Sequence, residues 1–232
     1  MRKPACIGLF IALLLCESAY PQATPAARHI PAKTPVGFEA EISTFMKQDS
    51  AQFPPAGAYL FTGSSTIRKW ENLAVDFPEI PVIHRGFGGS TMKALDYYTG
   101  YIVLPYKPRT IVVYEGDNDL AAGATPEAVV ALCDTFIMKV HRELPKTMIW
   151  FMSVKPSFAR KNQLALQQET NKRLKALIRK KKKTRFIDIT PLMYGSDGKL
   201  RRDLFESDSL HVNKECYRIW AGHMKRVMRI GK

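Results

Sequence analysis

Four short polar blocks contain the side chains that could do chemistry in this sequence. They occupy residues 61–65, 85–90, 116–119 and 208–211, and each lies at the end of an apolar run. Together they offer a hydroxyl, small residues with accessible backbone N–H groups, a side-chain amide, a carboxylate and an imidazole. Acyl transfer needs these groups, because a hydroxyl attacks, an imidazole moves the proton and N–H donors stabilise the oxyanion. The blocks therefore predict an enzyme that works on acyl groups.

Ser65 is the predicted nucleophile, because it opens a helical segment directly after an apolar run. Free backbone N–H groups at the start of a helix can face the anion that forms when a hydroxyl attacks a carbonyl. The N–H of Ser65, the N–H of Gly89 and the side-chain amide of Asn118 are the predicted oxyanion donors. Each block also has a purely structural interpretation: a helix-capping Gly-Ser-Ser turn, a flexible glycine turn and an Asx turn.

Asp208 and His211 lie three residues apart, just before a helical segment. This spacing lets the carboxylate turn back onto the imidazole, orient it and stabilise the imidazolium that forms when the other ring nitrogen takes the Ser65 proton. A helix-capping Asp followed by a surface His is the structural alternative. His84, His141 and His223 have no comparable partner nearby in the sequence. Asp208 and His211 are therefore the predicted acid and base.

Elements that end at one edge of a sheet must position these side chains. Short, partly β-branched apolar runs, typical of strands covered on both faces, occupy residues 58–62, 80–84, 110–114, 148–154 and 185–189. Helical patterns lie at about 91–104, 125–144, 162–182 and 213–230, and Thr34-Pro35 can cap an earlier helix with Phe38 and Ile42 on its apolar side.

The alternation of strands and helices predicts the fold class. It indicates a flavodoxin-like, three-layer α/β/α sandwich around a five-stranded parallel sheet, because each parallel connection needs a crossover. Ligands of such sheets bind outside the carboxyl ends of the strands. Ser65, Gly89 and Asn118 each follow a predicted strand, so we expect them to meet at that edge.

In type and order, the four blocks resemble those of the SGNH (GDSL-type) hydrolases, a family of esterases and acylhydrolases, and in particular its short bacterial single-domain members. The resemblance runs from about residue 59 to residue 220, and segments 104–108, 155–160 and 203–205 also look familial. It implies a catalytic triad of Ser65, Asp208 and His211. It also implies an oxyanion hole formed by Ser65, Gly89 and Asn118.

The sequence departs from the family pattern at three positions. Ser64 replaces the usual aspartate of the first block, Ser209 replaces the glycine of D-G-L-H, and Cys216 stands where close relatives usually have glycine. None of these changes removes a reacting group. The G-x-S-x-G elbow of classical α/β-hydrolases does not occur in the sequence.

We expect no cofactor and no metal. The glycines of the second block do not match the G-x-G-x-x-G fingerprint of dinucleotide-binding folds. Asp117 and Asp119 have no further ligands at metal-binding spacing. Cys133 and Cys216 fall on the apolar faces of predicted helices, which favours buried free thiols over a disulfide.

The N-terminal region indicates export. Residues 1–23 resemble a signal peptide, with Arg2 and Lys3 before a short apolar run; residues 24–33 form a linker and residues 34–232 the catalytic domain. No later run is long enough for a transmembrane segment. We expect a periplasmic or secreted protein. A lipid-anchored Cys16 is the weaker alternative, because the residue before it, Leu15, is large.

The formal net charge of +14 favours anionic surroundings. The basic run at residues 179–185 is typical of a solvated helix end, and the sequence has no nucleic-acid-binding motif. We expect a small-molecule or glycan ester as substrate and favour a carbohydrate O-acetylesterase, because no large apolar insertion could cover a long acyl chain. A lysophospholipase or thioesterase-type acylhydrolase, and a non-catalytic glycan-binding protein on this fold, stay open as alternatives.

Overall fold

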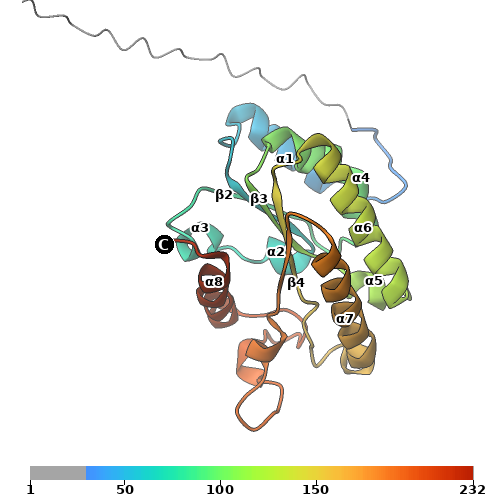
Figure 1. Ribbon diagram of the computed structural model, residues 1–232, viewed down its shortest axis with the longest axis vertical. Coiled ribbons are helices and arrows are strands. Elements are labelled where there is room, and N and C mark those ends of the chain that lie inside the picture. The colour runs from blue at the N-terminus through green and yellow to red at the C-terminus, as the bar shows by residue number, and fades with distance from the viewer. Residues whose placement is uncertain (1–29, 232) are drawn as a thin grey trace, which may run out of the picture.

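Five parallel strands form one sheet in the computed structural model, which describes residues 30–231 (Figure 1). The predicted signal peptide and most of the predicted linker lie outside the described residues. The strand order is β2-β1-β3-β4-β5, which confirms the flavodoxin-like α/β prediction. The strands are β1 Tyr59–Gly63, β2 Val82–Gly86, β3 Thr110–Tyr114, β4 Met148–Met152 and β5 Thr184–Ile187.

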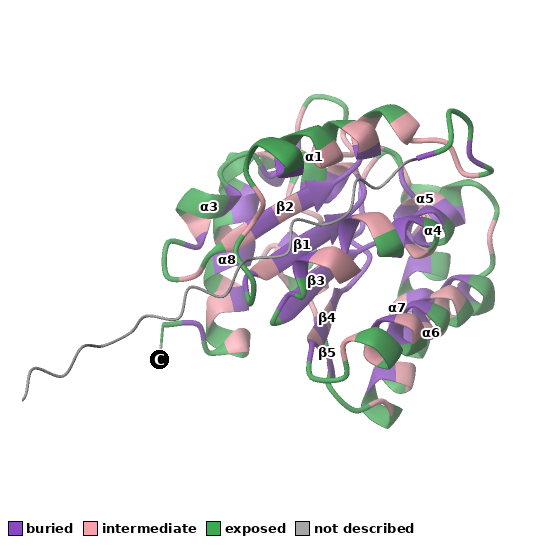
Figure 2. Cartoon of the chain, turned by 90° about the horizontal axis from the view of Figure 1, so that it is seen from above, coloured by how far each residue is buried: buried purple, intermediate pink, exposed green. Residues whose placement is uncertain are grey.

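Helices cover both faces of the sheet (Figure 2). One face carries α1 Glu39–Ala51, α4 Met92–Ile102, α6 Pro126–Glu143 and α7 Leu164–Lys180, and the other carries α2 Ser65–Arg68, α3 Leu73–Asp76 and α8 Lys214–Met228. The short helix α5 Asp117–Ala121 follows β3. Among residues 30–231, no helix is long and apolar enough to span a membrane.

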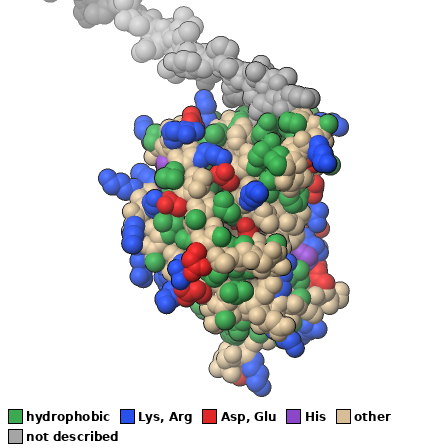
Figure 3. Space-filling view, turned by 90° about the vertical axis from the view of Figure 1, so that its right-hand side faces the viewer, with side chains coloured by type: hydrophobic (Ala, Val, Ile, Leu, Met, Phe, Trp, Pro, Cys, Tyr) green, Lys and Arg blue, Asp and Glu red, His purple; other side chains and the backbone are tan. Residues whose placement is uncertain are grey.

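The outer face of α6 and α7 carries its charged side chains mainly around the rim. Lys and Arg side chains surround much of its outline, with fewer Asp and Glu side chains between them (Figure 3). Several of these cations are paired: Arg173 binds Glu127 and Glu169, both at 2.7 Å, and Lys181 lies 2.5 Å from Asp134. Within the basic run at residues 179–185, Lys181 is paired in this way, whereas Arg179, Lys180, Lys182 and Lys183 are exposed, so the run forms a solvated end of α7.

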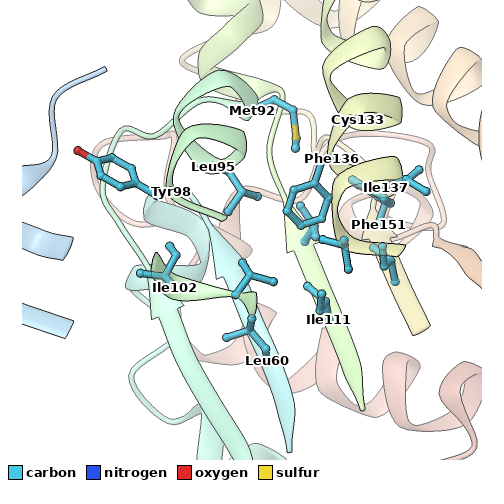
Figure 4. Packing of buried hydrophobic residues seen from close by; sticks show 14 of the residues in the cluster. Leu60, Met92, Leu95, Tyr98, Ile102, Ile111, Cys133, Phe136, Ile137 and Phe151 are labelled. Carbon is cyan, nitrogen blue, oxygen red and sulfur yellow. The ribbon is translucent and has the colours of Figure 1, made fainter. Parts of the chain in front are cut away.

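The strands are apolar on both faces because each face packs against helices. Leu60 points into the cluster beneath α4 and α6, whereas its neighbour Phe61 points into the cluster beneath α8. Figure 4 shows Leu95 of α4 and Phe136 of α6 packed over Leu60 and Ile111. The helices that pack on these clusters hold the sheet in place. The first three polar blocks follow the carboxyl ends of its strands, so their positions depend on this packing.

Side chains cap three of the main helices at their N-termini. Thr91, Thr125 and Asn213 accept hydrogen bonds from the backbone N–H of Ala94, Ala128 and Cys216, at 3.3, 3.2 and 3.1 Å. Such caps satisfy N–H groups that have no partner within the helix. The Thr125-Pro126 start of α6 is therefore confirmed.

The predicted start of the first helix at Thr34-Pro35 is wrong. The helix begins at Glu39, after Phe38 adopts a left-handed conformation with φ of 72°. The Thr34 hydroxyl instead lies 2.9 Å from the Tyr98 hydroxyl and donates to the Gly37 carbonyl at 3.2 Å. Tertiary contacts with α4 thus use the polar atoms that the sequence assigned to a cap.

Both cysteines within the described residues are free and buried, as predicted. Cys133 of α6 lies in the cluster on one face of the sheet and Cys216 of α8 in the cluster on the other. The sheet therefore separates the two thiols.

Candidate active site

The first polar block forms the start of α2 at the carboxyl end of β1. Ser65 is the first residue of this four-residue helix, so its N–H has no acceptor within the helix. The end of the helix is held by two other side chains. Tyr217 of α8 donates its hydroxyl to the Thr66 carbonyl at 2.7 Å, and His84 of β2 donates Nε2–H to the Ile67 carbonyl at 2.6 Å.

Ser65, His211 and Asp208 form one chain of hydrogen bonds. His211 Nε2 lies 2.9 Å from Ser65 Oγ, and His211 Nδ1 lies 2.5 Å from Asp208 Oδ2. The carboxylate cannot donate, so Nδ1 carries the proton and Nε2 can accept the serine proton. The structure thus brings the three predicted side chains together, although Ser65 and His211 lie 146 residues apart in the sequence.

The turn between Asp208 and His211 fixes the carboxylate. Asp208 Oδ1 accepts the backbone N–H groups of Leu210 and His211, both at 2.9 Å. Partial burial by itself would raise the pKa of Asp208, but the hydrogen bonds from the His211 ring and from these two N–H groups lower it well below its usual value. Asp208 is therefore a carboxylate at neutral pH.

Ser209 lies between Asp208 and Leu210, at the position where the D-G-L-H block usually has glycine. Its φ of 63° lies in the left-handed region, which explains why glycine is usual there. The Ser209 hydroxyl accepts a hydrogen bond from Arg202 at 2.6 Å.

Gly89 and Asn118 lie in the segments that follow the carboxyl ends of β2 and β3. Gly89 has a φ of 82°, which disfavours any residue with a side chain. Asn118 is the second residue of α5, and its Nδ2 donates one hydrogen to the Ser90 carbonyl at 2.9 Å. The amide nitrogen has a second hydrogen for another acceptor.

Three buried carboxyl groups surround Asn118 in sequence. Asp119 accepts the Met92 N–H at the start of α4, at 3.0 and 3.1 Å, and Glu115 accepts the Ser90 hydroxyl at 2.5 Å. Burial raises the pKa of both Glu115 and Asp119. These contacts tie the segment after β3 to the glycine block after β2, so they set the position of Asn118 relative to Gly89.

The third carboxyl, Asp117, forms ion pairs with two cations, Arg160 and Lys155. Its Oδ1 lies 2.8 Å from Arg160 NH1 and its Oδ2 3.6 Å from Lys155 Nζ. Lys155 is 1% exposed and donates to the Leu210 carbonyl at 2.8 Å. Burial lowers the pKa of Lys155, and the charge of Asp117 opposes this shift. Lys155 thereby connects the segment after β4 to the turn that carries Asp208 and His211.

Gly86 allows α2 to lie against β2. A Cβ at this position would lie 2.3 Å from the backbone nitrogen of Arg68. From the sequence, Gly86 was predicted only as part of a turn, and no role was predicted for Lys155, Arg160 or Tyr217. The only available signal was the family-like segment at residues 155–160.

Among residues 30–231, one set of side chains has ligand atoms close enough for a metal ion. Single ligand atoms of Glu206, Asp208 and His211 lie within 4.8 Å of one another. The Asp208 and His211 groups already bind each other, and Glu206 Oε2 lies 2.5 Å from Lys69 Nζ. Because each carboxylate already has a cationic or N–H partner, these side chains are better suited to holding the loop at residues 206–211 than to binding a metal ion.

Solved structures with the same fold come from several bacteria. A protein from Streptococcus pneumonia superposes with a TM-score of 0.72 at 18% identity, covering 82% of this chain and 92% of its own. A GDSL-like lipase from Bacteroides thetaiotaomicron gives 0.69 at 20%, covering 82% and 98%, and an acetyl-xylooligosaccharide esterase from Geobacillus gives 0.60 at 16%, covering 77% and 96%. No curated protein matches the sequence.

The family comparison covers most of the chain. The model of the GDSL-like Lipase/Acylhydrolase family matches residues 56–219, a range that includes all four polar blocks. This match and the shared fold confirm the family resemblance seen in the sequence. The chain belongs to the GDSL-like lipase/acylhydrolase family.

Proposed function

We propose that this protein is an exported serine esterase that hydrolyses carboxylic esters through an acyl-enzyme on Ser65. The observation that carries the proposal is the continuous hydrogen-bond chain from Asp208 through His211 to Ser65, with distances of 2.5 and 2.9 Å. It lies at the edge of the sheet where β1 and β3, neighbours in the sheet, both end. Ligands of open α/β sheets bind at such switch points.

The reaction follows from the positions of the groups. Ser65 Oγ attacks the ester carbonyl carbon while its proton moves to His211 Nε2. The N–H of Ser65, the N–H of Gly89 and the second Nδ2–H of Asn118 donate to the oxyanion. The tetrahedral intermediate then collapses: the C–O bond to the alcohol breaks, and the alcohol leaves with the proton held by His211.

Water completes the cycle. His211 takes a proton from the water as its oxygen attacks the acyl carbon, and a second tetrahedral intermediate forms. Its collapse breaks the bond to Ser65, returns the proton to Ser65 Oγ and releases the acid. Asp208 orients the ring and balances the imidazolium charge throughout.

Ser65→Ala tests the reaction. The variant keeps the helix start but removes the nucleophile, so hydrolysis of p-nitrophenyl acetate should fall by about 10⁴-fold or more. The purified variant should keep the melting temperature of the wild type. Full activity of Ser65→Ala would remove the proposal.

For the substrate, we favour a short acyl group, acetyl first, on a carbohydrate. Gly89 is exposed and Ser65 is half-buried, so the site is open to bulky alcohols such as a glycan chain. The Geobacillus structural neighbour is an acetyl-xylooligosaccharide esterase, which supports this choice. Faster acetate release from O-acetylated polysaccharide than fatty-acid release from lysophospholipid is the expected result. The reverse order would assign the protein to the lysophospholipase class.

Export is the remaining part of the proposal. It rests on residues 1–23, in which two basic residues precede a short apolar run. Expression of the full chain in a bacterial host should yield a shortened protein outside the cytoplasm, with its new N-terminus read by mass spectrometry. Full-length protein confined to the cytoplasm would contradict this part without affecting the chemistry.

A further inference from the structure

Arg160 is a cation beside the candidate site that the reaction above does not use. It lies in the segment after β4, and its side chain is 16% exposed. One arm of its guanidinium, NH1, pairs with Asp117 Oδ1 at 2.8 Å, and the other, NH2, donates to Asn118 Oδ1 at 2.8 Å. The two anchor residues are adjacent at the start of α5, so one side chain holds both.

The contact with Asn118 settles which way its amide points. The Oδ1 atom faces a guanidinium, which only donates, and Nδ2 faces the Ser90 carbonyl oxygen, which only accepts. A flipped amide would set NH₂ against the guanidinium and oxygen against the Ser90 carbonyl. Both pairs repel, so the amide keeps the orientation in which Nδ2 carries the free hydrogen.

The same contact strengthens the free hydrogen as a donor. A cation that donates to the amide oxygen draws electron density from the amide nitrogen, and linked hydrogen bonds polarise one another. The effect is largest where water is scarce, and the surroundings meet this condition: Asp117 is 5% exposed and Ser90 is fully buried. The benefit grows as negative charge develops on the substrate oxygen, so it acts on the transition state.

We propose that Arg160 is a positioning residue that orients and polarises the Asn118 side chain as an oxyanion donor. The inference rests on the proposed esterase function and on the oxyanion role of Asn118. It predicts an effect that passes entirely through Asn118. A residue that only supported the fold would not behave in this way.

A double-mutant cycle provides the test, with p-nitrophenyl acetate as substrate. Asn118→Ala should lower kcat by about 10²- to 10³-fold, and Arg160→Met by about 10- to 100-fold with KM changed less than about threefold. In the Asn118→Ala background, Arg160→Met should change kcat by less than about twofold, because the group it acts on is gone. Equal fold-losses of Arg160→Met in both backgrounds would overturn the inference.

Two further variants serve as a control and as a replacement. Arg173→Met removes an arginine that pairs with Glu127 and Glu169 on the surface, and it should leave kcat unchanged. If Arg160→Met does not fold, Arg160→Lys replaces it in the cycle, because lysine keeps a charge beside Asp117 but cannot reproduce both guanidinium arms. The cycle is then judged by the same criterion.

The outcomes separate this inference from the proposed function. If Ser65→Ala or Asn118→Ala keeps wild-type kcat, the proposed chemistry itself is wrong. If both variants lose activity while Arg160 and Asn118 act additively, only the role of Arg160 is wrong.

Discussion

At the scale of single residues, the arrangement around His211 depends on one carboxylate with three donors. Asp208 accepts the His211 ring N–H and two backbone N–H groups, and its lowered pKa keeps it ionised. In Asp208→Asn, the amide can keep the backbone bonds through its oxygen but would present NH₂ to His211 Nδ1. The ring would then adopt the tautomer that cannot take the serine proton, and kcat should fall by about 10⁴-fold.

To check this prediction, kcat and the melting temperature of Asp208→Asn are both measured and compared with those of the wild type. A nearly unchanged melting temperature with a large loss of kcat is the expected pair of results. Activity within about tenfold of the wild type would show that another group orients His211.

Two glycines give a matched test of close packing. A Cβ at Gly86 would meet the Arg68 backbone nitrogen at 2.3 Å, whereas a Cβ at Gly100 in α4 meets nothing within 4 Å. Gly86→Ala should lower the free energy of unfolding by about 1–3 kcal/mol and displace Ser65. Gly100→Ala should raise it by about 0.5–1 kcal/mol, because alanine favours a helix.

Urea unfolding of both variants checks this prediction. Opposite signs of the two changes are expected, together with lost esterase activity in Gly86→Ala alone. A Gly86→Ala variant as stable and active as Gly100→Ala would show that α2 does not need its close approach to β2.

At the scale of elements, α2 cannot be stable by itself, since it has four residues. Its carbonyls are held by Tyr217 and His84, and Trp70 just beyond it stacks on Tyr217 at 4.9 Å. Tyr217→Phe keeps the stacking but leaves the buried Thr66 carbonyl without its donor. The free energy of unfolding should fall by about 1–3 kcal/mol.

Chemical denaturation measures this loss, and the pattern of kcat adds a second check. A lower kcat at unchanged KM is expected if the bond also holds Ser65 in place. An unchanged free energy of unfolding would mean that water replaces the hydroxyl.

The long elements could be predicted from the sequence because their signals are local. The run at residues 110–114 matches β3, and the Thr125-Pro126 start matches α6, since apolar spacing and a cap determine them. The helices α2 and α5, of four and five residues, have no periodicity to detect, so the sequence indicated where α2 begins, at Ser65, but not where it ends. The start of α1 was mispredicted because contacts with Tyr98 of α4 use Thr34.

The same distinction applies to the candidate site. Ser65, Gly89 and Asn118 could be placed at one edge because strand ends of a parallel sheet converge there. The contacts of Arg160, Lys155 and Tyr217 could not, since each joins segments tens of residues apart, such as the 151 residues between Tyr217 and Thr66. Such contacts depend on how the helices pack on the sheet.

At the scale of the whole molecule, acid should destabilise the protein in part through His84. Burial lowers the pKa of His84, so the folded state favours the neutral ring that donates to the Ile67 carbonyl. Its contribution to stability is present above the unfolded pKa of about 6.5 and is lost as the pH falls through the lower folded pKa. The net charge of +14 adds repulsion as further groups become protonated.

His84→Gln tests this contribution, because an amide can still donate to the Ile67 carbonyl but does not titrate. The drop in unfolding free energy between pH 7.5 and pH 5 should be smaller in the variant than in the wild type. Equal drops would assign the acid sensitivity to other groups, such as the partly buried His223, whose pKa is also lowered by burial.

If Ser65 forms the acyl-enzyme, a fluorophosphonate should trap it, because the same hydroxyl attacks the phosphorus atom. Intact-mass analysis of the wild type should show one added phosphonyl group, located on Ser65 by peptide mapping. Ser65→Ala should remain unlabelled, and His211→Ala should react far more slowly. Labelling of a different serine, or ester hydrolysis by protein that resists the reagent, would rule out Ser65 as the nucleophile.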